Sequence, residues 1–403
     1  MLELALASIT FGQCVLAATL LMMRGVRTHA YVPLALFFSI YAVTLSSTLA
    51  LHLNPSLEMP LIATSLAVVL LMWPMLWFYL EAMTAQSIWR FRRRHLVHVA
   101  PVSLGVICAA MMAGLPEFTR NALFIDDQTV ELTVQAALTM LMVILIIIVW
   151  LVQAAAYLIL GLRRLVRYRR TLKDVFASTE KREMSWLIPV FIALGVTWAF
   201  EFVDLSSDSV FIPGHIEEVL NLSLVFTLAV WGSRQTPGFD QAYLACDPDM
   251  LTKFGYGAES PIPQEAFSTN QKKYEKSALT EDQARRICGK LERLMQVEHP
   301  YLDPDLSLPR LAQRLSVSRN ILSQTLNETL NRSFFEYVNS YRIKASLPHL
   351  TEGTNSILTI AMDVGFNSRS AFYKAFKAET GLTPSAFRNL LQSDPNTAPT
   401  ETI

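Results

Sequence analysis

The sequence predicts an all-α protein: a seven-helix transmembrane bundle, followed by a cytoplasmic domain in which a long helix joins two helix-turn-helix units. Three observations support this fold class. The chain is apolar, with 52% hydrophobic residues and a mean hydropathy of +0.32. Its charges are concentrated towards the C-terminus, because residues 1–232 hold 30 charged residues whereas residues 233–403 hold 38. One helical pattern also occurs twice, over residues 307–326 and 357–376.

Seven apolar stretches are long enough to cross a bilayer, since a hydrocarbon core about 30 Å thick needs a helix of about 20 apolar residues. The first is not expected to be a cleaved signal peptide, because its basic residues follow it. Pro74 is expected to kink the third stretch. Residues 1–232 are therefore predicted to form a sensor or anchor domain. The stretches are 2–23, 31–53, 61–83, 97–115, 132–160, 186–203 and 213–232.

Basic residues set the expected orientation. The segments that follow the first, third and fifth stretches carry fourteen lysines and arginines, and the three alternate segments carry only Arg120. Basic segments stay on the cytoplasmic side of a membrane. The chain is therefore predicted to cross the membrane several times, with its N-terminus outside and its C-terminus in the cytoplasm.

Three carboxylates, Glu201, Glu217 and Glu218, lie near the outer ends of the last two stretches. Ionisable residues inside a membrane are costly and point to function. One interpretation is an outward-facing acidic site that senses a small molecule or protons. The other is that these side chains lie among the lipid headgroups and face water, so that the spans only anchor the chain. The sequence leaves both open.

The residues after the last stretch change in character. Residues 233–279 are rich in proline and glycine without apolar periodicity, which predicts a cytoplasmic linker. A helix is expected to begin after Thr280, because Thr280 and Gln283 have the spacing of a capping box. Residues 280–390 are predicted to form a helical domain, and residues 391–403 a disordered tail.

Each copy of the repeated pattern consists of a helix, a tight turn and a second helix. Leu311-Ala312 matches Ile360-Ala361, and Leu315-Ser316-Val317 matches Val364-Gly365-Phe366. A small alanine lets two helices cross closely, and a glycine or small residue allows the turn. The pattern therefore predicts two helix-turn-helix units. Residues 333–348 between them are predicted to form a connecting helix about 20 Å long.

Residues 281–390 resemble the DNA-binding domain of the AraC/XylS family of bacterial transcription regulators. The resemblance is carried by "SFFEYVNSYRIKAS" and "IAMDVGFNSRSAFYKAFKAETGLTPSAFR". The upstream part resembles, more loosely, a membrane-anchored subset of this family. Two residues depart from the pattern. Asn331 replaces a glycine where a left-handed backbone is expected, which asparagine tolerates. Pro348 replaces an aliphatic residue and is expected to end or kink the connecting helix.

The resemblance implies that the exposed start of each second helix enters the major groove of DNA. Arginine pairs well with guanine, and asparagine or glutamine with adenine; a phosphate contact is the alternative for each residue. Residues 310–388 carry ten basic and five acidic residues, a surplus that suits phosphate binding. The residues expected to contact DNA are Arg319, Asn320, Ser323 and Gln324 in the first unit, and Arg369, Ser370 and Lys374 in the second.

The predicted function is a membrane-bound, sequence-specific DNA-binding transcription regulator of the bacterial inner membrane, which couples a signal at the spans to promoter binding. The expected partners are double-stranded DNA, the lipid bilayer, an unidentified small-molecule or proton signal, a second copy of the chain in a homodimer, and RNA polymerase if the protein is an activator. The alternative is a seven-span receptor or transporter whose tail binds proteins. No enzyme activity, cofactor or metal is expected, because no CxxC pair, phosphate-binding glycine loop, HExxH motif or nucleophile elbow occurs.

Overall fold

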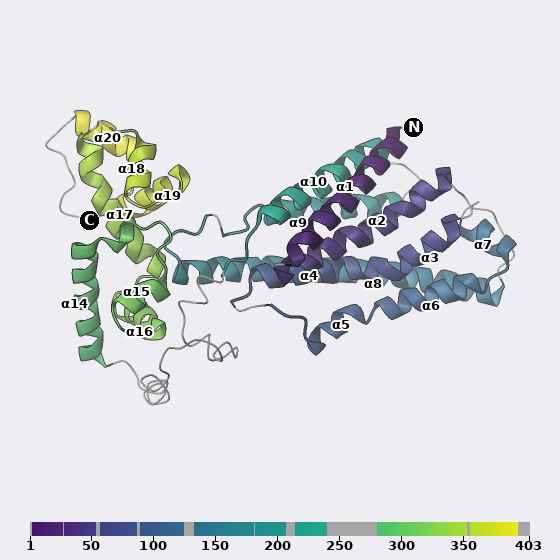
Figure 1. The fold of residues 1–403 in the computed structure, drawn as a ribbon. Helices are drawn as coiled ribbons and strands as arrows, with labels where there is room; N and C mark the ends of the chain where they lie inside the picture. The colour runs from purple at the N-terminus through teal and green to yellow at the C-terminus, as the bar shows by residue number, and fades with distance from the viewer. Residues whose placement is uncertain are drawn as a thin grey trace. The chain divides into compact units, whose positions relative to one another are not determined.

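The computed structural model describes residues 2–26, 28–53, 57–86, 89–124, 133–180, 182–206, 214–239, 280–352 and 355–393 of the 403-residue chain. Within these ranges every regular element is a helix, and the one strand-like pairing is an isolated bridge between Phe176 and Ser307. This confirms the all-helical prediction for the described residues. The chain forms two compact units, one of Met1–Val166 with Met184–Gly238 and one of Arg167–Glu183 with Phe239–Ile403 (Figure 1).

The first unit is a set of apolar helices. α1 packs against α2 and α10, and α3 packs against α2 and α6. The helices are α1 (Leu2–Gly25), α2 (Val32–Leu53), α3 (Glu58–Val68), α4 (Met72–Met83), α5 (Leu96–Val99), α6 (Val102–Ala113), α7 (Glu117–Phe124), α8 (Val134–Val175), α9 (Leu187–Ser206) and α10 (Gly214–Arg234).

Five helices among the described residues are long and apolar enough to cross a membrane, or six if one bent pair counts as a single span. α9 (Leu187–Ser206) covers the sixth predicted stretch, and its side chains are described only up to Thr197. The predicted count of seven spans therefore stays a prediction. The five are Leu2–Gly25, His29–Ser47, Met59–Met83, Val134–Val175 and Ile216–Arg234, and the bent pair is Arg93–Val99 with Val102–Ala113.

Two of the predicted stretches are interrupted at prolines. Pro74 lacks the N–H group that would bond to the carbonyl of Leu70, and its ring collides with that carbonyl. The helix accordingly breaks one turn earlier, where a 3₁₀ turn over Val69–Leu71 separates α3 from α4. Pro101 lies between α5 and α6, whose axes differ by 41°.

α8 is much longer than the predicted fifth span. It has 42 residues and continues to Val175 through basic residues that were expected to lie in a loop. Arginine, leucine and lysine are good helix formers, so the change from apolar to basic residues ends the membrane-like segment without ending the helix. The chain passes from the first unit to the second inside α8, after Val166.

Tyrosine hydroxyl groups secure the end of α10 within the first unit. The last carbonyl groups of a helix have no partner inside it. The hydroxyl of Tyr31 donates to the carbonyl of Gln235 at 2.7 Å, and that of Tyr79 donates to the carbonyl of Gly232 at 3.0 Å. These bonds fix the point where the chain leaves the apolar helices.

The second unit contains shorter helices around two hydrophobic cores. The capping box predicted at Thr280 is confirmed: its hydroxyl accepts from the N–H of Gln283, whose side-chain oxygen accepts from the N–H of Thr280. The elements are α14 (Glu281–Glu298), η6 (Pro300–Leu302), α15 (Leu308–Arg314), α16 (Arg319–Gln324), η7 (Thr325–Thr329), α17 (Phe334–Glu352), α18 (Ile357–Asp363), α19 (Arg369–Thr380) and α20 (Pro384–Ser393).

α17 is the predicted connecting helix, and it contributes to both cores. Phe334 and Val338 pack into the core of α14, α15 and α16, whereas Ile343 and Leu350 pack into the core of α18, α19 and α20. Pro348 was expected to end or kink this helix; it lies inside α17, which continues to Glu352, so it does not end the helix.

The predicted linker and tail are described only in part. α10 reaches Arg234, two residues past the predicted boundary, and residues 240–279 lie outside the described ranges. At the C-terminus, residues 391–393 belong to α20 rather than to a disordered tail, and residues 394–403 lie outside the described ranges.

Candidate nucleic-acid interface

The turns between α15 and α16 and between α18 and α19 have the same backbone geometry. Ser316 and Gly365, matched in the sequence, both have positive φ angles, of 56° and 92°. The N–H of Val317 donates to the carbonyl of Ala312 at 3.0 Å, and the N–H of Phe366 donates to that of Ala361 at 2.9 Å. The sequence match of the two copies therefore holds at the level of individual hydrogen bonds.

Serine caps begin the second helix of each pair. Ser318 Oγ accepts from the N–H of Ile321 at 3.3 Å, and Ser368 Oγ accepts from the N–H of Ala371 at 3.1 Å. A side-chain acceptor at this position satisfies an N–H group that the helix itself cannot. The caps fix where α16 and α19 begin, and so which side chains stand in their first turns.

The four residues predicted to read DNA from the first pair all lie on α16. Asn320 is exposed, and Arg319, Ser323 and Gln324 are half-buried. Gln324 Nε2 donates to the carboxylate of Glu328 at 2.8 Å, and Ser323 Oγ accepts from the side-chain amide of Asn327 at 3.4 Å. Asn320 is thus the most accessible of the four.

The three residues predicted from the second pair are exposed on α19: Arg369, Ser370 and Lys374. Arg369 is held against Tyr373, one turn along the helix. Its Nη2 donates to the tyrosine hydroxyl at 2.9 Å, and its Cζ lies 4.9 Å from the centroid of the ring. The same hydroxyl lies 2.6 Å from Ser385 Oγ in α20.

The contact of Tyr373 with Arg369 was not predicted from the sequence. The signal was an arginine and an aromatic residue four positions apart, a spacing that places two side chains together on a helix. An arginine side chain that a neighbour already holds in one orientation, as Tyr373 holds Arg369, loses less conformational entropy when it binds a ligand.

Arg342, in the middle of α17, is fully buried and joins the two helix pairs. Its Nε donates to the carbonyl of Tyr301 at 2.7 Å and its Nη2 to that of Asp303 at 2.9 Å. Its Cζ lies 5.4 Å from the ring centroid of Phe366, which follows the turn of the second pair. Burial lowers the pKa of the Arg342 guanidinium to about 10, so it remains protonated at neutral pH.

A short segment after α8 also belongs to this unit. The N–H of Ala177 donates to the carbonyl of Leu306 at 3.2 Å, and Phe176 forms the isolated bridge with Ser307, the residue before α15. Arg342 Nη1 donates to the carbonyl of Ala177 at 3.2 Å and to Ser178 Oγ at 3.0 Å. Residues that were expected to lie in a loop of the membrane domain therefore pack into the second unit.

The predicted sensing residues lie in the first unit. Glu201 is in α9, and its side chain is not among those that the structure describes. Glu217 and Glu218 are in the first turns of α10, and Glu218 lies within electrostatic range of Glu217 and of Glu3 in α1. Glu3 was not singled out in the sequence, because no pattern connects it with α10.

No group of histidine, cysteine and carboxylate side chains suited to a metal ion occurs among the described residues.

Comparison with known proteins identifies one part of the chain. Residues 311–390, from α15 to α20, match a family model described as a helix-turn-helix domain. No solved structure matches.

Three similar proteins each match about a quarter of this chain and less than two fifths of their own length. The Msm operon regulatory protein of Streptococcus mutans is 32% identical over 26% of this chain and 37% of its own length. An uncharacterized HTH-type transcriptional regulator of Staphylococcus aureus is 30% identical over 28% of this chain and 14% of its own. The HTH-type transcriptional regulator YtdP of Bacillus subtilis is 28% identical over 25% of this chain and 13% of its own length. The C-terminal part of the chain therefore contains a helix-turn-helix domain, and proteins that resemble it are named as transcription regulators.

Proposed function

We propose that this protein is a membrane-anchored transcription regulator of the AraC type, which binds promoter DNA through two helix-turn-helix units. The observation that carries the proposal is the helix-turn-helix match over residues 311–390, in which α16 and α19 begin at equivalent serine caps. Arg319 and Asn320 in the first helix, and Arg369 and Lys374 in the second, have the hydrogen-bonding groups that read guanine and adenine or hold phosphate.

The two units would occupy successive major-groove segments on one face of the duplex. α17 contributes to both hydrophobic cores, and Arg342 bonds to the segment before α15 while it stacks on Phe366. A fixed separation of two recognition helices selects a fixed spacing of half-elements, about 34 Å for one turn of DNA. We infer an operator with two such half-elements.

Chromatin mapping of the tagged full chain in cells tests the DNA-binding part. We expect discrete peaks with a shared two-part sequence, which the double variant Arg319→Ala with Arg369→Ala loses at equal abundance. If tagged protein of normal abundance yields no sequence-dependent peaks, the tail is the protein-interaction module of the alternative function.

The membrane part of the proposal rests on the apolar helices of the first unit and on the basic segments between them. Five or six of these helices have the length and composition of a span, and fourteen of fifteen basic residues fall on one set of alternate segments. We place the protein in the bacterial inner membrane, with its N-terminus outside and the helix-turn-helix domain in the cytoplasm.

Reporter fusions after residue 60 and after residue 236 test this orientation. Alkaline phosphatase is active only outside the cytoplasm, so we expect activity from the first fusion and none from the second. Activity from the second fusion would place the helix-turn-helix domain away from DNA and contradict the proposal.

We also propose that Glu201, Glu217 and Glu218 couple an external signal to the DNA-binding domain. Glu218 Oε2 is buried without a hydrogen-bond partner among the described residues, and α10 packs against α1, which carries Glu3. A proton or a cationic ligand would relieve the repulsion between these carboxylates and change the packing of α10. A homodimer that rearranges with α10, and contact with RNA polymerase if the protein activates transcription, complete the proposed mechanism.

A further inference from the structure

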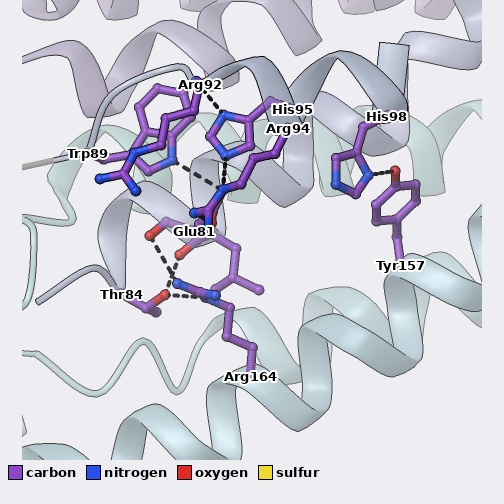
Figure 2. Close-up of polar contacts among 10 residues, drawn as sticks. Glu81, Thr84, Trp89, Arg92, Arg94, His95, His98, Tyr157 and Arg164 are labelled. Carbon is purple, nitrogen blue, oxygen red and sulfur yellow. Dashed lines mark hydrogen bonds and ion pairs between the residues drawn. The ribbon is translucent and has the colours of Figure 1, made fainter. Parts of the chain in front are cut away.

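A polar cavity of about 510 Å³ lies in the first unit, at the end of α4 opposite to its proline break. Four arginines line it: Arg90, Arg92 and Arg94 from the segment after α4, and Arg164 from α8. Glu81 is the one carboxylate among the described lining residues. Figure 2 shows Arg94, His95 and Trp89 gathered on one side of Glu81, and Arg164 and Thr84 on the other.

The carboxylate of Glu81 organises the cavity but cannot balance its charge. Oε1 accepts from Arg94 Nη2 at 3.3 Å, and Oε2 accepts from Trp89 Nε1 at 3.2 Å. Four arginines and one carboxylate give the described lining residues a formal charge of about +3. Like charges gathered in a partly enclosed space repel one another unless an anion joins them.

His95 fixes the loop that presents these arginines. The imidazole is 3% exposed, and its Nδ1 accepts from the main-chain N–H of Arg92 at 3.1 Å. Its Nε2 lies 3.4 Å from Glu81 Oε2 and 3.3 Å from Arg94 Nε. The ring also stacks on Trp89, with centroids 5.7 Å apart and planes 9° from parallel. The positions of Arg92 and Arg94 beside His95 are therefore built into the fold.

Arg164 approaches from the other side with its orientation set. Its Nε donates to Thr84 Oγ1 at 2.6 Å and its Nη2 donates to the main-chain carbonyl of Glu81 at 3.4 Å. Its Cζ lies 5.5 Å from the ring centroid of Trp77. A guanidinium is planar, and its geometry matches the oxygen atoms of a phosphate group.

From this geometry we propose that the cavity binds an anion with a multiply charged phosphate, that is, a phosphomonoester or a pyrophosphate. Its volume lies in the range of about 300–1,000 Å³ of pockets for small ligands. The surplus of about three charges favours a phosphate with two or more negative charges over a singly charged phosphodiester.

Two sources supply this chemistry. The arginine segment follows directly on the apolar span Met59–Met83, at the level where the headgroup of an anionic lipid would lie. A soluble phosphorylated metabolite has the same group. Binding of a lipid headgroup rests on the membrane location proposed above, whereas binding of a soluble phosphate does not. An experiment can therefore contradict one source without contradicting the other.

The experiment uses the purified full chain in phosphatidylcholine nanodiscs. In one arm phosphatidate, a monoester lipid, is added to the discs, with phosphatidylglycerol, a diester, as the matched lipid. In the other arm inorganic pyrophosphate is titrated into the solution. The rise of the melting temperature of the first unit with ligand gives the apparent affinity in each arm.

The chain offers a matched pair of variants within one basic run. Arg92 lines the cavity and its neighbour Arg93 does not, and both are exposed. We expect saturable stabilisation by phosphatidate, by pyrophosphate or by both, which Arg92→Gln and Arg164→Gln weaken about tenfold or more, as the loss of a charge-assisted hydrogen bond predicts. Arg93→Gln should stay within about twofold, because it removes the same charge without removing a donor from the cavity.

Saturation by phosphatidate alone identifies a lipid site, and saturation by pyrophosphate identifies a site for a soluble ligand. The proposal is overturned if neither ligand stabilises the wild type. It is also overturned if Arg93→Gln weakens the response as much as Arg92→Gln, or if phosphatidylglycerol acts as well as phosphatidate, since general surface charge would then explain the effect.

Discussion

The guanidinium of Arg342 donates a hydrogen bond to the main-chain carbonyl oxygen of Ala177, a residue 165 positions earlier in the chain. Ala177 follows α8, whose apolar part belongs to the first unit, and Arg342 lies near the middle of α17, which packs against both helix pairs. The second unit is thus built from two distant parts of the sequence. Arg342 is the side chain on which both parts and the segment at Tyr301 converge.

Arg342→Lys should destabilise the second unit. A lysine ammonium cannot reach the carbonyls of Tyr301, Asp303 and Ala177 together, and each buried carbonyl left without a donor costs about 1–3 kcal/mol. We expect the free energy of opening of residues 300–346 to fall by about 2–4 kcal/mol in native-state hydrogen exchange of the full chain. The control is Arg332→Lys, because its ion pair with Glu379 is partly exposed and should change the value by less than about 1 kcal/mol. Equal effects of the two variants would show that Arg342 has no such role.

Gly365 and Gly381 give a matched test of the turn in the second pair. Both have positive φ angles, of 92° and 77°. A Cβ atom at Gly365 would lie 2.6 Å from the carbonyl oxygen of Tyr301, whereas a Cβ atom at Gly381 meets nothing within 4 Å. Gly381→Ala should cost about 1–2 kcal/mol from the backbone alone. Gly365→Ala should cost at least twice as much, because the turn must also move away from η6. Denaturant unfolding of both variants checks this, and a smaller loss for Gly365→Ala would contradict the close packing of the turn.

Arg369→Ala should weaken binding to the native operator by about 1–3 kcal/mol and relax the preference at one base pair, if the arginine reads guanine. Tyr373→Phe keeps the ring beside Arg369 and removes only the hydroxyl that orients it, so a smaller loss of about 0.5–1.5 kcal/mol is expected. Fluorescence anisotropy with native and base-substituted duplexes separates the outcomes. A uniform loss on all sequences for Arg369→Ala would make this residue a phosphate contact instead.

Replacing Glu201, Glu217 and Glu218 together by glutamine should abolish the response of the regulated promoter to external pH or to an external cationic inducer. Glutamine keeps the size of the side chain and removes the charge that a signal would neutralise. Promoter output is measured over a range of external pH at equal membrane abundance. A response like that of the wild type would mean that these carboxylates lie among the lipid headgroups without a sensing role.

Local patterns in the sequence predicted local structure well. The equivalence of Ser316 and Gly365, the left-handed backbone at Asn331 and the capping box at Thr280 are all confirmed, because each depends on residues within a few positions of one another. The interruption near Pro74 was also expected, since it follows from the missing N–H of proline.

Features that depend on distant residues were not predicted. A run of arginines after an apolar helix indicates a cytoplasmic segment, but it does not reveal that α8 continues to Val175 or that Ala177 packs beside Leu306. The cavity around Glu81 was not predicted for the same reason. Arg92 and Arg94 were counted only as basic residues that orient the chain, and Arg164 comes from another helix. In each case the sequence gives the charge of a residue but not its distant partner.

The most direct test of the proposed DNA binding is a titration of the full protein in lipid nanodiscs with a fluorescent duplex from one of its chromatin peaks. We predict that the native duplex binds at least about a thousandfold more tightly than a scrambled duplex of equal length at the same salt concentration. The double variant Arg319→Ala with Arg369→Ala should lose most of that preference while it still binds both duplexes weakly. Equal affinity of the wild-type protein for native and scrambled DNA, or no binding to either, would contradict the proposed function.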